Sequence, residues 1–279
     1  MNTEVKATGM QVKAKAEKGI LINEVATSDD TNWDEEAKSG QTSAISLHAT
    51  STANTKTWYT ASSKKSADGA GAAASSKNSN LNGDYITLGS TGYTTKTETV
   101  AAVEGASAKR DITYIDADAD NAYDDGEGYY VMYTYYVKSS GDAISCDTAA
   151  NGTSFRIKEV KAEGASDSED LDKALRVGVV VNSKAYIYAP LNSSVGTYYV
   201  AATTATTPLT GLQATSLQSI PAKTADGTPV YVYIWFEGED PNCMTDNITA
   251  TLDSLTIDVT FSLNENGSSS VTDNGVTVA

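Results

Sequence analysis

Apolar and polar residues alternate along the first part of the chain, and the phase of this alternation shifts at Thr8-Gly9. Val5 and Ala7 share one face before the shift. The apolar positions that share a face after it are Met10, Val12, Ala14 and Ala16. A period of two is typical of a strand with one buried face, and a glycine at a phase shift indicates a bulge or a bend. The pattern predicts an extended N-terminal arm over residues 1–24 that bends near Gly9.

Strand patterns dominate the remainder of the chain. Residues 129–137 form a dense run of aromatic and β-branched residues, which predicts a central strand. Residues 174–181 and 184–189 flank Asn182-Ser183 and predict a hairpin. One short helix is expected over residues 166–173, where a serine cap precedes acidic residues. Further strands are expected at residues 20–22, 45–47, 57–59, 84–88, 97–103, 154–161, 197–201, 229–236 and 249–263.

Many short strands with at most one or two short helices indicate an all-β fold, either a β-sandwich or a jelly roll. Residues 62–83 are rich in Ser, Ala, Gly and Asn and predict a long loop. No repeat of fixed period is present, which argues against a solenoid. We therefore divide the chain into an arm, residues 1–24, and one β-sandwich domain, residues 25–279.

The chain is acidic: 36 Asp and Glu residues against 20 Lys and Arg residues give a formal net charge of −16. Such a surface repels phosphate backbones and anionic lipid headgroups, so neither nucleic acid nor a membrane is an expected partner. No stretch reaches the roughly 20 apolar residues that span a bilayer. We expect a secreted protein at the cell surface or outside the cell. A mature chain whose leader had been removed would look like this, although a cytosolic protein would also lack a leader.

The sharpest local motif is a run of acidic residues. Acids occupy positions 1, 3, 5, 9 and 12 of a twelve-residue window, at Asp116, Asp118, Asp120, Asp124 and Glu127. This spacing allows one loop to surround a hard cation with oxygen atoms, as in calcium loops. Asn121 stands where such loops prefer glycine. The motif predicts a calcium loop between strands, and the alternative is an acidic, solvated turn.

Catalytic motifs are missing from the sequence. The single histidine, His48, excludes a histidine-clustered metal site, and neither HExxH nor GxSxG occurs. Glu237, Glu239 and Asp240 follow an apolar strand, and we interpret them as a strand-ending loop rather than as an acid/base pair. We expect no enzymatic activity and no small-molecule substrate.

The cysteines and tryptophans each have two interpretations. Cys146 and Cys243 either form a disulfide, as in many secreted proteins, or pack as separate small hydrophobic residues. Trp33, Trp58 and Trp235 either stack on sugars or pack in the core, and the apolar strand around Trp235 favours the core.

Four segments together resemble the TasA/camelysin-like secreted surface proteins of Gram-positive bacteria. They are Asn2 to Val12, Tyr129 to Lys138, Ala174 to Val179 and Val232 to Cys243. The resemblance implies a jelly-roll subunit of biofilm-matrix or cell-surface fibres, whose N-terminal segment inserts as a donor strand into the next subunit. Camelysin-like members have been called metallopeptidases, but this sequence has no HExxH motif for that activity.

The residues themselves favour the same assembly. An alternating strand that precedes any visible partner strand has an unpaired edge, and strand addition to a neighbouring copy would satisfy it. Head-to-tail contacts that do not close generate filaments, so the expected partner is the chain itself. The side chains predicted to insert are Val5, Met10, Val12 and Ala14. Two alternatives stay open: an arm folded back on its own sheet, and a monomeric adhesion module that binds carbohydrate or calcium through Trp58, Tyr59 and the acidic loop.

Overall fold

A computed structural model of the chain establishes an all-β architecture. It describes residues 4–8, 10–17, 19–38, 45–61, 85–90, 94–101, 109–116, 118–122, 124, 127–146, 153–163, 171–190, 198–200, 213–238, 240, 251–253, 255–264 and 275–278. Within these residues the only helix is a short 3-10 turn, η2 (Leu171–Ala174).

The strands in the first part of the chain are β1 (Glu4–Thr8), β2 (Gln11–Ala16), β3 (Ile20–Asn23), β4 (Glu36–Lys38), β5 (Ile45–His48), β6 (Thr50–Ser51), β7 (Tyr59–Ala61), β8 (Tyr85–Thr87), β9 (Lys96–Ala101), β10 (Lys109–Tyr114) and β11 (Gly128–Ser139). Those that follow are β12 (Ile144–Ser145), β13 (Ser154–Glu163), β14 (Leu175–Val181), β15 (Lys184–Pro190), β16 (Tyr198–Val200), β17 (Gln213–Ala214), β18 (Ser219–Ile220), β19 (Thr228–Phe236), β20 (Thr251–Asp253), β21 (Thr256–Asn264) and β22 (Val276–Thr277).

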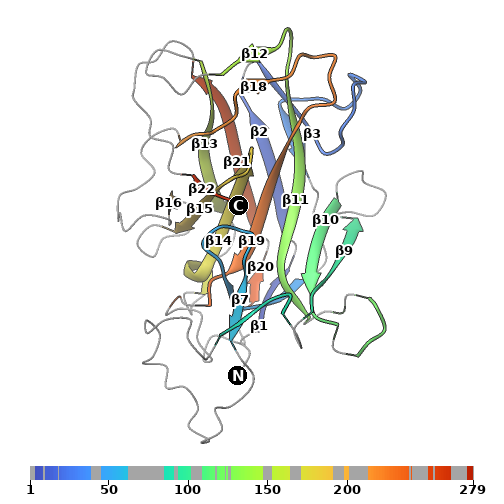
Figure 1. Cartoon of the computed structure of the whole chain (residues 1–279), viewed down its shortest axis with the longest axis vertical. Coiled ribbons are helices and arrows are strands. Elements are labelled where there is room, and N and C mark those ends of the chain that lie inside the picture. Colours follow the sequence, from blue (N-terminus) through green and yellow to red (C-terminus); the bar gives the residue numbers. More distant parts are fainter. Residues whose placement is uncertain are drawn as a thin grey trace, which may run out of the picture.

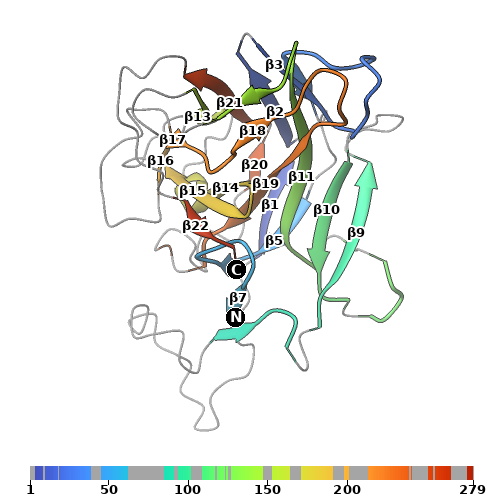
Figure 2. The same ribbon diagram turned by 45° about the horizontal axis from the view of Figure 1, so that its top comes forward.

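Two main sheets form a sandwich-like arrangement (Figures 1 and 2). The large sheet has twelve strands, with β16-β15-β14-β19-β11-β5-β1-β20 as its main path and β3, β9, β10 and β22 attached to it. The small sheet has five strands in the order β17-β13-β21-β2-β4. Two minor sheets, β12-β18 and β6-β7-β8, complete the fold. The predicted all-β sandwich is confirmed, whereas the jelly-roll connectivity stays a prediction.

The central strand of the large sheet is β11, as its sequence predicts. It pairs with β19 along one edge and with β10 and β3 along the other. Its inward side chains, Val131, Tyr133, Tyr135 and Val137, are buried in the core between the sheets. This alternation follows from the pleat, which places successive side chains on opposite faces.

The N-terminal segment belongs to both sheets. β1 lies in the large sheet and β2 in the small sheet, so the chain changes sheets between these two strands. β20 and β21 change sheets beside it, and they pair with β1 and β2 in parallel. Lys6 lies opposite Thr251 and Ala16 opposite Phe261, and the register offset is the same on both sides of the corner. Strands that switch sheets at a bend commonly form such corners in β-sandwiches.

This arrangement corrects one expectation from the sequence. The leading strand does have partners in its own chain: β1 lies between β5 and β20, and β2 lies between β21 and β4. The arm therefore adopts the folded-back alternative in a single molecule. The sequence could not show this, because the parallel partners lie at the far end of the described chain and parallel pairing leaves no local turn signal. The division at residue 24 stays a prediction about assembly.

Local patterns were more informative about the hairpin than about the helix. β14 and β15 pair as predicted, and Asn182 and Ser183 adopt positive φ values of 46° and 62° in the turn. Positive φ at both central positions is the geometry that matches the twist of a two-residue hairpin. Of the predicted helix, the structure describes only η2, and residues 166–170 lie outside the described residues.

Gly227 shows how closely the turn before β19 packs. Its φ is +92°, and a Cβ there would lie 2.6 Å from Cη2 of Trp33. Gly89 has a similar φ of +88° but open space around it, and at Gly141 the space is also open.

We predict that Gly227→Ala destabilises the fold more than Gly89→Ala does. Both substitutions place a side chain in a backbone conformation that costs on the order of 1 kcal/mol, but only Gly227→Ala also collides with a rigid indole. Urea denaturation should rank the unfolding free energies as Gly141→Ala, then Gly89→Ala, then Gly227→Ala, from most to least stable. Equal stability of the last two would show that Trp33 does not press on this turn.

Candidate functional site

The segment predicted to mediate assembly lies along one continuous ladder. We call the pairing of residues 4–16 with β20 and β21 the N-terminal seam. The Gln11 backbone N–H donates to the Leu255 carbonyl at 2.8 Å, and the Glu17 N–H donates to the Phe261 carbonyl at 2.9 Å. On the opposite edge of β2, the Ala16 N–H donates to the Glu35 carbonyl at 2.7 Å. Both edges of β2 are therefore hydrogen-bonded.

The inward side chains of β2 anchor the seam in the core. Met10 is 1% exposed, and Val12 and Ala14 are fully buried. The Tyr135 hydroxyl donates across the sandwich to the Val12 carbonyl at 3.2 Å. Full burial of a Val or Met side chain stabilises by about 1.5–3 kcal/mol, so this face holds β2 firmly. Val5 lies in β1 opposite Leu47, and its side chain lies outside the described residues.

The outward side of the seam carries ion pairs. Lys15 Nζ lies 2.5 Å from Asp258 Oδ2, and Lys158 pairs with Glu17. Lys15 is about one-third exposed, whereas both members of the Lys158–Glu17 pair are largely exposed. Exposed pairs of this kind contribute about 0–1 kcal/mol. The Lys15–Asp258 pair favours the observed register of β2 against β21, and the Lys158–Glu17 pair links the end of β2 to β13.

The segment between β3 and β4 holds β4 against the outer edge of β2. Asp34 bridges to Ile22, with backbone N···O distances of 2.7 and 3.2 Å. The Trp33 indole N–H donates to the Thr27 carbonyl at 3.1 Å. The Lys138 side chain is fully buried, and its Nζ lies 4.1 Å from the centre of the Trp33 ring. Because cation–π attraction strengthens when water is excluded, this contact fixes the loop strongly.

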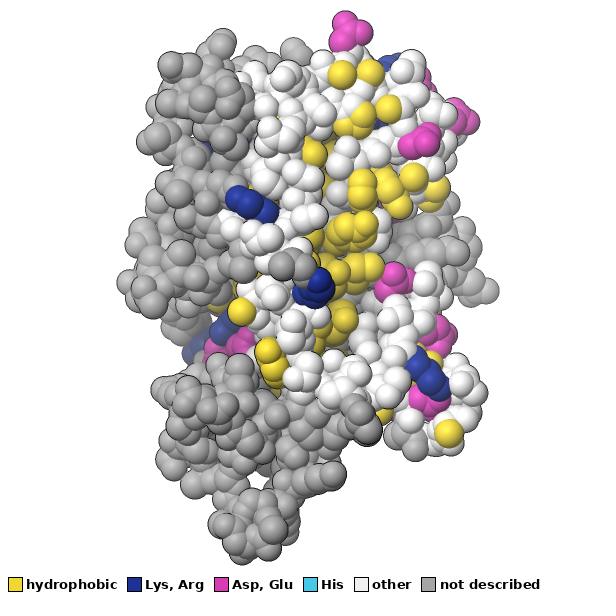
Figure 3. All heavy atoms as spheres, in the orientation of Figure 1, with side chains coloured by type: hydrophobic (Ala, Val, Ile, Leu, Met, Phe, Trp, Pro, Cys, Tyr) yellow, Lys and Arg dark blue, Asp and Glu magenta, His cyan; other side chains and the backbone are white. Residues whose placement is uncertain are grey.

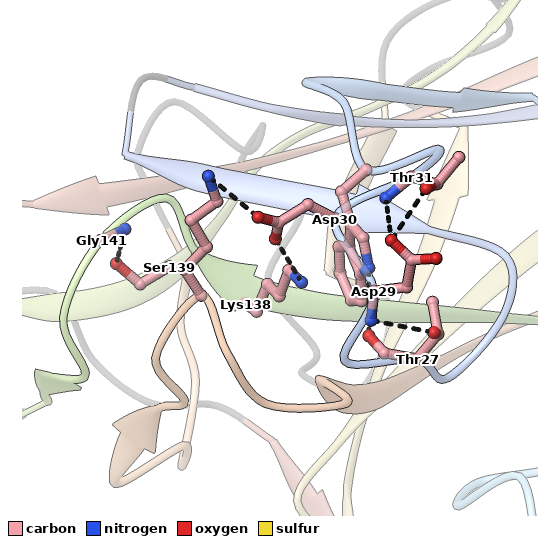
Figure 4. A network of polar contacts seen from close by, with 9 residues as sticks. Thr27, Asp29, Asp30, Thr31, Lys138, Ser139 and Gly141 are labelled. Atoms are coloured by element: carbon pink, nitrogen blue, oxygen red, sulfur yellow. Dashed lines mark hydrogen bonds and ion pairs between the residues drawn. The ribbon is translucent and has the colours of Figure 1, made fainter.

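Asp30 completes this connection, and its carboxylate points toward Lys138 (Figure 4). We call the network of Asp30, Trp33, Lys138 and Lys223 the β4 clamp. Asp30 Oδ1 lies 3.4 Å from Lys138 Nζ, and Oδ2 lies 3.1 Å from Lys223 Nζ. The Lys223 hydrogen bond is the main reason that the pKa of Asp30 is lowered, and Lys138 adds to it. One carboxylate thus joins the loop before β4 to the end of β11 and to the turn before β19.

The acidic residues lie between β10 and β11. One carboxylate oxygen from each of Asp116, Asp118 and Asp120 lies within 4.8 Å of the others. The Asp124 N–H donates to the Glu127 carboxylate at 3.3 Å. The spacing in the sequence therefore identified three acids that converge.

Neighbouring charges shape the acidic loop. The Lys96 ammonium pairs with Asp116, and this hydrogen bond is the main reason that the pKa of Asp116 is lowered. Lys96 also donates to the Asn121 side chain at 2.8 Å. The pKa of Asp124 is raised, mainly by the charge of Asp120 and then by desolvation and the other acids. Lys96 lies on β9, and nothing in the acidic motif itself indicated its involvement.

The carboxylates after β19 have structural partners. Glu237 accepts hydrogen bonds from the Ser51 hydroxyl and, at 3.2 Å, from the Trp235 indole N–H. Asp240 pairs with Arg176 at 2.7 Å. Both contacts agree with the interpretation of this segment as a strand-ending loop. Glu239 lies outside the described residues.

The cysteine and tryptophan alternatives have different outcomes. Cys146 is a buried, free thiol whose pKa is raised by burial. Cys243 itself lies outside the described residues. Trp58 and Trp235 are almost fully buried and meet edge to face, with ring centres 5.2 Å apart. Trp33 is 9% exposed, so the core-packing interpretation of the tryptophans is confirmed.

Half-buried tyrosines lie on the outer face of the large sheet, next to the buried Trp58 and Trp235. Tyr130 and Tyr233 are half-buried neighbours of Trp58, and the Trp58 and Tyr130 rings stack at 3.9 Å. Apolar side chains, counting tyrosine, form a band along this side of the molecule (Figure 3). Tyr130 alternates with core residues along β11, and Tyr233 does so along β19. This alternation in the sequence predicts an outward-facing row of tyrosines.

Comparisons with known proteins add no assignment: no family model, curated protein or solved structure matches the chain. Among the described residues, no helix has both the length and the apolar character needed to cross a membrane.

The β4 clamp should open in acid. A carboxylate with a lowered pKa stabilises the fold above its ordinary pKa of about 3.9, and that contribution disappears as the pH falls through the lowered value. The Trp33 indole N–H resonance should therefore shift below about pH 4 in an NMR titration. Asp30→Asn should remove this shift, whereas Asp29→Asn should retain it, because Asp29 is bonded chiefly to Thr31. An unchanged shift in Asp30→Asn would show that Asp30 does not hold the clamp.

Proposed function

We propose that this chain is the structural subunit of an extracellular filament, a biofilm-matrix or cell-surface fibre, that grows by exchange of the N-terminal strand between copies. The observation that carries this proposal is the N-terminal seam. β1 and β2 run parallel to β20 and β21, one pair in each sheet, and each of the two strands has a partner on both edges. An identical strand from a second copy can make the same contacts in the same register.

The position of the strand in the topology supports exchange. β1 and β2 precede every other described strand, so their removal breaks no connection between the remaining strands. Their removal would leave unpaired the strand edges that now face β1 and β2. These edges belong to β5 and β20 in the large sheet and to β4 and β21 in the small sheet. Unpaired edges of this kind are templates for strand addition, and the pockets left by Met10, Val12 and Ala14 would select side chains of matching size.

The energetics favour slow growth. Because the seam contacts are the same within one chain and between two chains, exchange changes the free energy little once it is complete. Withdrawing β2 first exposes Met10 and Val12, which costs about 1.5–3 kcal/mol for each side chain, and it also separates β2 from the clamped β4. In the folded-back monomer, the chain's own N-terminal strand occupies the position that a strand from another copy would take. Polymerisation therefore requires a high protein concentration or prior opening of the seam.

Each copy that donates one strand and accepts one strand has two different contact surfaces. Contacts of this kind build open filaments when the rotation between copies does not close a ring. The net charge of −16 would keep unassembled copies apart in solution. The resulting fibre needs neither a cofactor nor a substrate.

A disulfide across the seam tests the proposal. Gln11 and Thr256 are opposite one another in the parallel register, and both are half-buried. Neighbouring strands lie about 4.8 Å apart, which is within the range that a disulfide spans. In a background with both native cysteines replaced by alanine, oxidised Gln11→Cys/Thr256→Cys should form no filaments in electron micrographs. Reduction should restore them.

A matched control joins two strands that stay together during exchange. Thr134 and Tyr231 are paired between β11 and β19, outside the seam, and both are half-buried. Oxidised Thr134→Cys/Tyr231→Cys should therefore form filaments like the unmodified chain. Normal filaments from the oxidised seam variant, with free thiols absent by titration, would rule out strand exchange. Monodisperse protein from the unmodified chain at every concentration would contradict the filament itself.

A further inference from the structure

We propose that Asp116, Asp118 and Asp120 bind a calcium ion, and that Lys96 serves as their counter-ion when no metal is bound. One oxygen of each carboxylate lies within 4.8 Å of the others. Calcium–oxygen distances are about 2.3–2.6 Å, so two oxygens on opposite sides of one ion lie about 5 Å apart. The three side chains are thus already gathered on the scale of one ion.

A buried oxygen atom in this cluster lacks a partner. The Asp116 side chain is only 5% exposed, and its Oδ1 is buried without a hydrogen bond. A buried polar atom left unsatisfied costs about 1–3 kcal/mol, and more when it is charged. The other oxygen, Oδ2, accepts from Lys96 and from the Asn121 backbone N–H. A bound cation would satisfy the remaining oxygen, and the exposed Asp118 and Asp120, together with water, would supply further oxygen ligands from the solvent side.

The charge balance also favours a divalent ion. Five carboxylates gather in this loop, and Lys96 pairs with one of them, Asp116. The Lys96 side chain is 38% exposed, so its ammonium group can move away into water. Two positive charges on one small ion would offset the repulsion among the acids more fully than one ammonium group does.

The donor atoms select the class of metal. The predicted ligands are carboxylate oxygens, which suit hard cations, and soft metals prefer sulfur or imidazole ligands. Calcium tolerates irregular coordination, whereas magnesium demands a near-ideal octahedron. We expect a dissociation constant on the order of 10⁻⁴ to 10⁻³ M, which is typical of extracellular calcium modules.

Calorimetric titration of the full chain with calcium chloride, after removal of metals by chelation, tests the site. Unmodified protein should bind one ion with the stated affinity and melt at a higher temperature with calcium than with sodium at equal ionic strength. Asp116→Asn and Asp120→Asn should each weaken binding at least tenfold. Asp142→Asn, which alters an exposed acid in the turn after β11, should bind calcium normally.

The Lys96→Met variant distinguishes two interpretations of the acidic loop: a site that binds a metal ion, and a turn that is held only by the Lys96–Asp116 ion pair. If Lys96 competes with the ion, its removal should strengthen calcium binding several-fold. If the ammonium group is the only cation that the loop uses, Lys96→Met should lower the melting temperature and calcium should not restore it. No binding by either the unmodified chain or Lys96→Met at millimolar calcium would overturn the proposal. An equal thermal shift with sodium would overturn it too, because it would indicate general charge screening.

Discussion

Two segments that are far apart in sequence run side by side and turn together from one sheet into the other. This parallel seam joins residues 4–16 to β20 and β21 and supplies neighbours to β5 in the large sheet and to β4 in the small sheet. The seam also closes the core, because Met10, Val12 and Ala14 fill it from β2. Removing the leading strand would therefore open both layers of the sandwich at once.

In the proposed exchange, the contacts that stabilise one molecule would form again between molecules. A strand held by backbone hydrogen bonds and a few buried side chains can be replaced by its copy without any change in chemistry. In the proposed exchange, the β4 clamp would act on this replacement from a distance, since Asp30 and Lys138 hold the loop that positions β4 beside β2. The acidic loop connects β10 to β11, strands of the large sheet that do not pair with β2.

The sequence predicted what depends on near neighbours. Alternation after Gly9 identified the inward residues of β2, and Asn182-Ser183 identified the hairpin turn, because both features arise from local backbone geometry. Non-local pairing was not visible, and neither were Lys96 beside the acids nor Asp30 beside Lys138. β10 was overlooked although Ile112 and Tyr114 alternate, since the charged Arg110 occupies an interior position and is only 3% exposed. The three-residue step from Leu252 to Leu255 marks the second corner and, in retrospect, could have revealed the sheet crossing.

The exchange of the leading strand is tested most directly by asking which molecule supplies it. Ala14 and Val259 lie opposite one another across the seam, so their methyl groups provide a contact that magnetic resonance can detect. Two batches of the chain are prepared, one isotope-labelled at the Ala14 methyl group and the other at the Val259 methyl groups. Filaments grown from an equal mixture of the two should show the contact between Ala14 of one chain and Val259 of another. Dilute monomer from the same mixture should not show it. A third batch carries both labels in the same chain and is diluted with unlabelled chain before filaments are grown. If the contact appears in these filaments and is missing from those of the mixture, the account is contradicted, because each copy would then have kept its own strand.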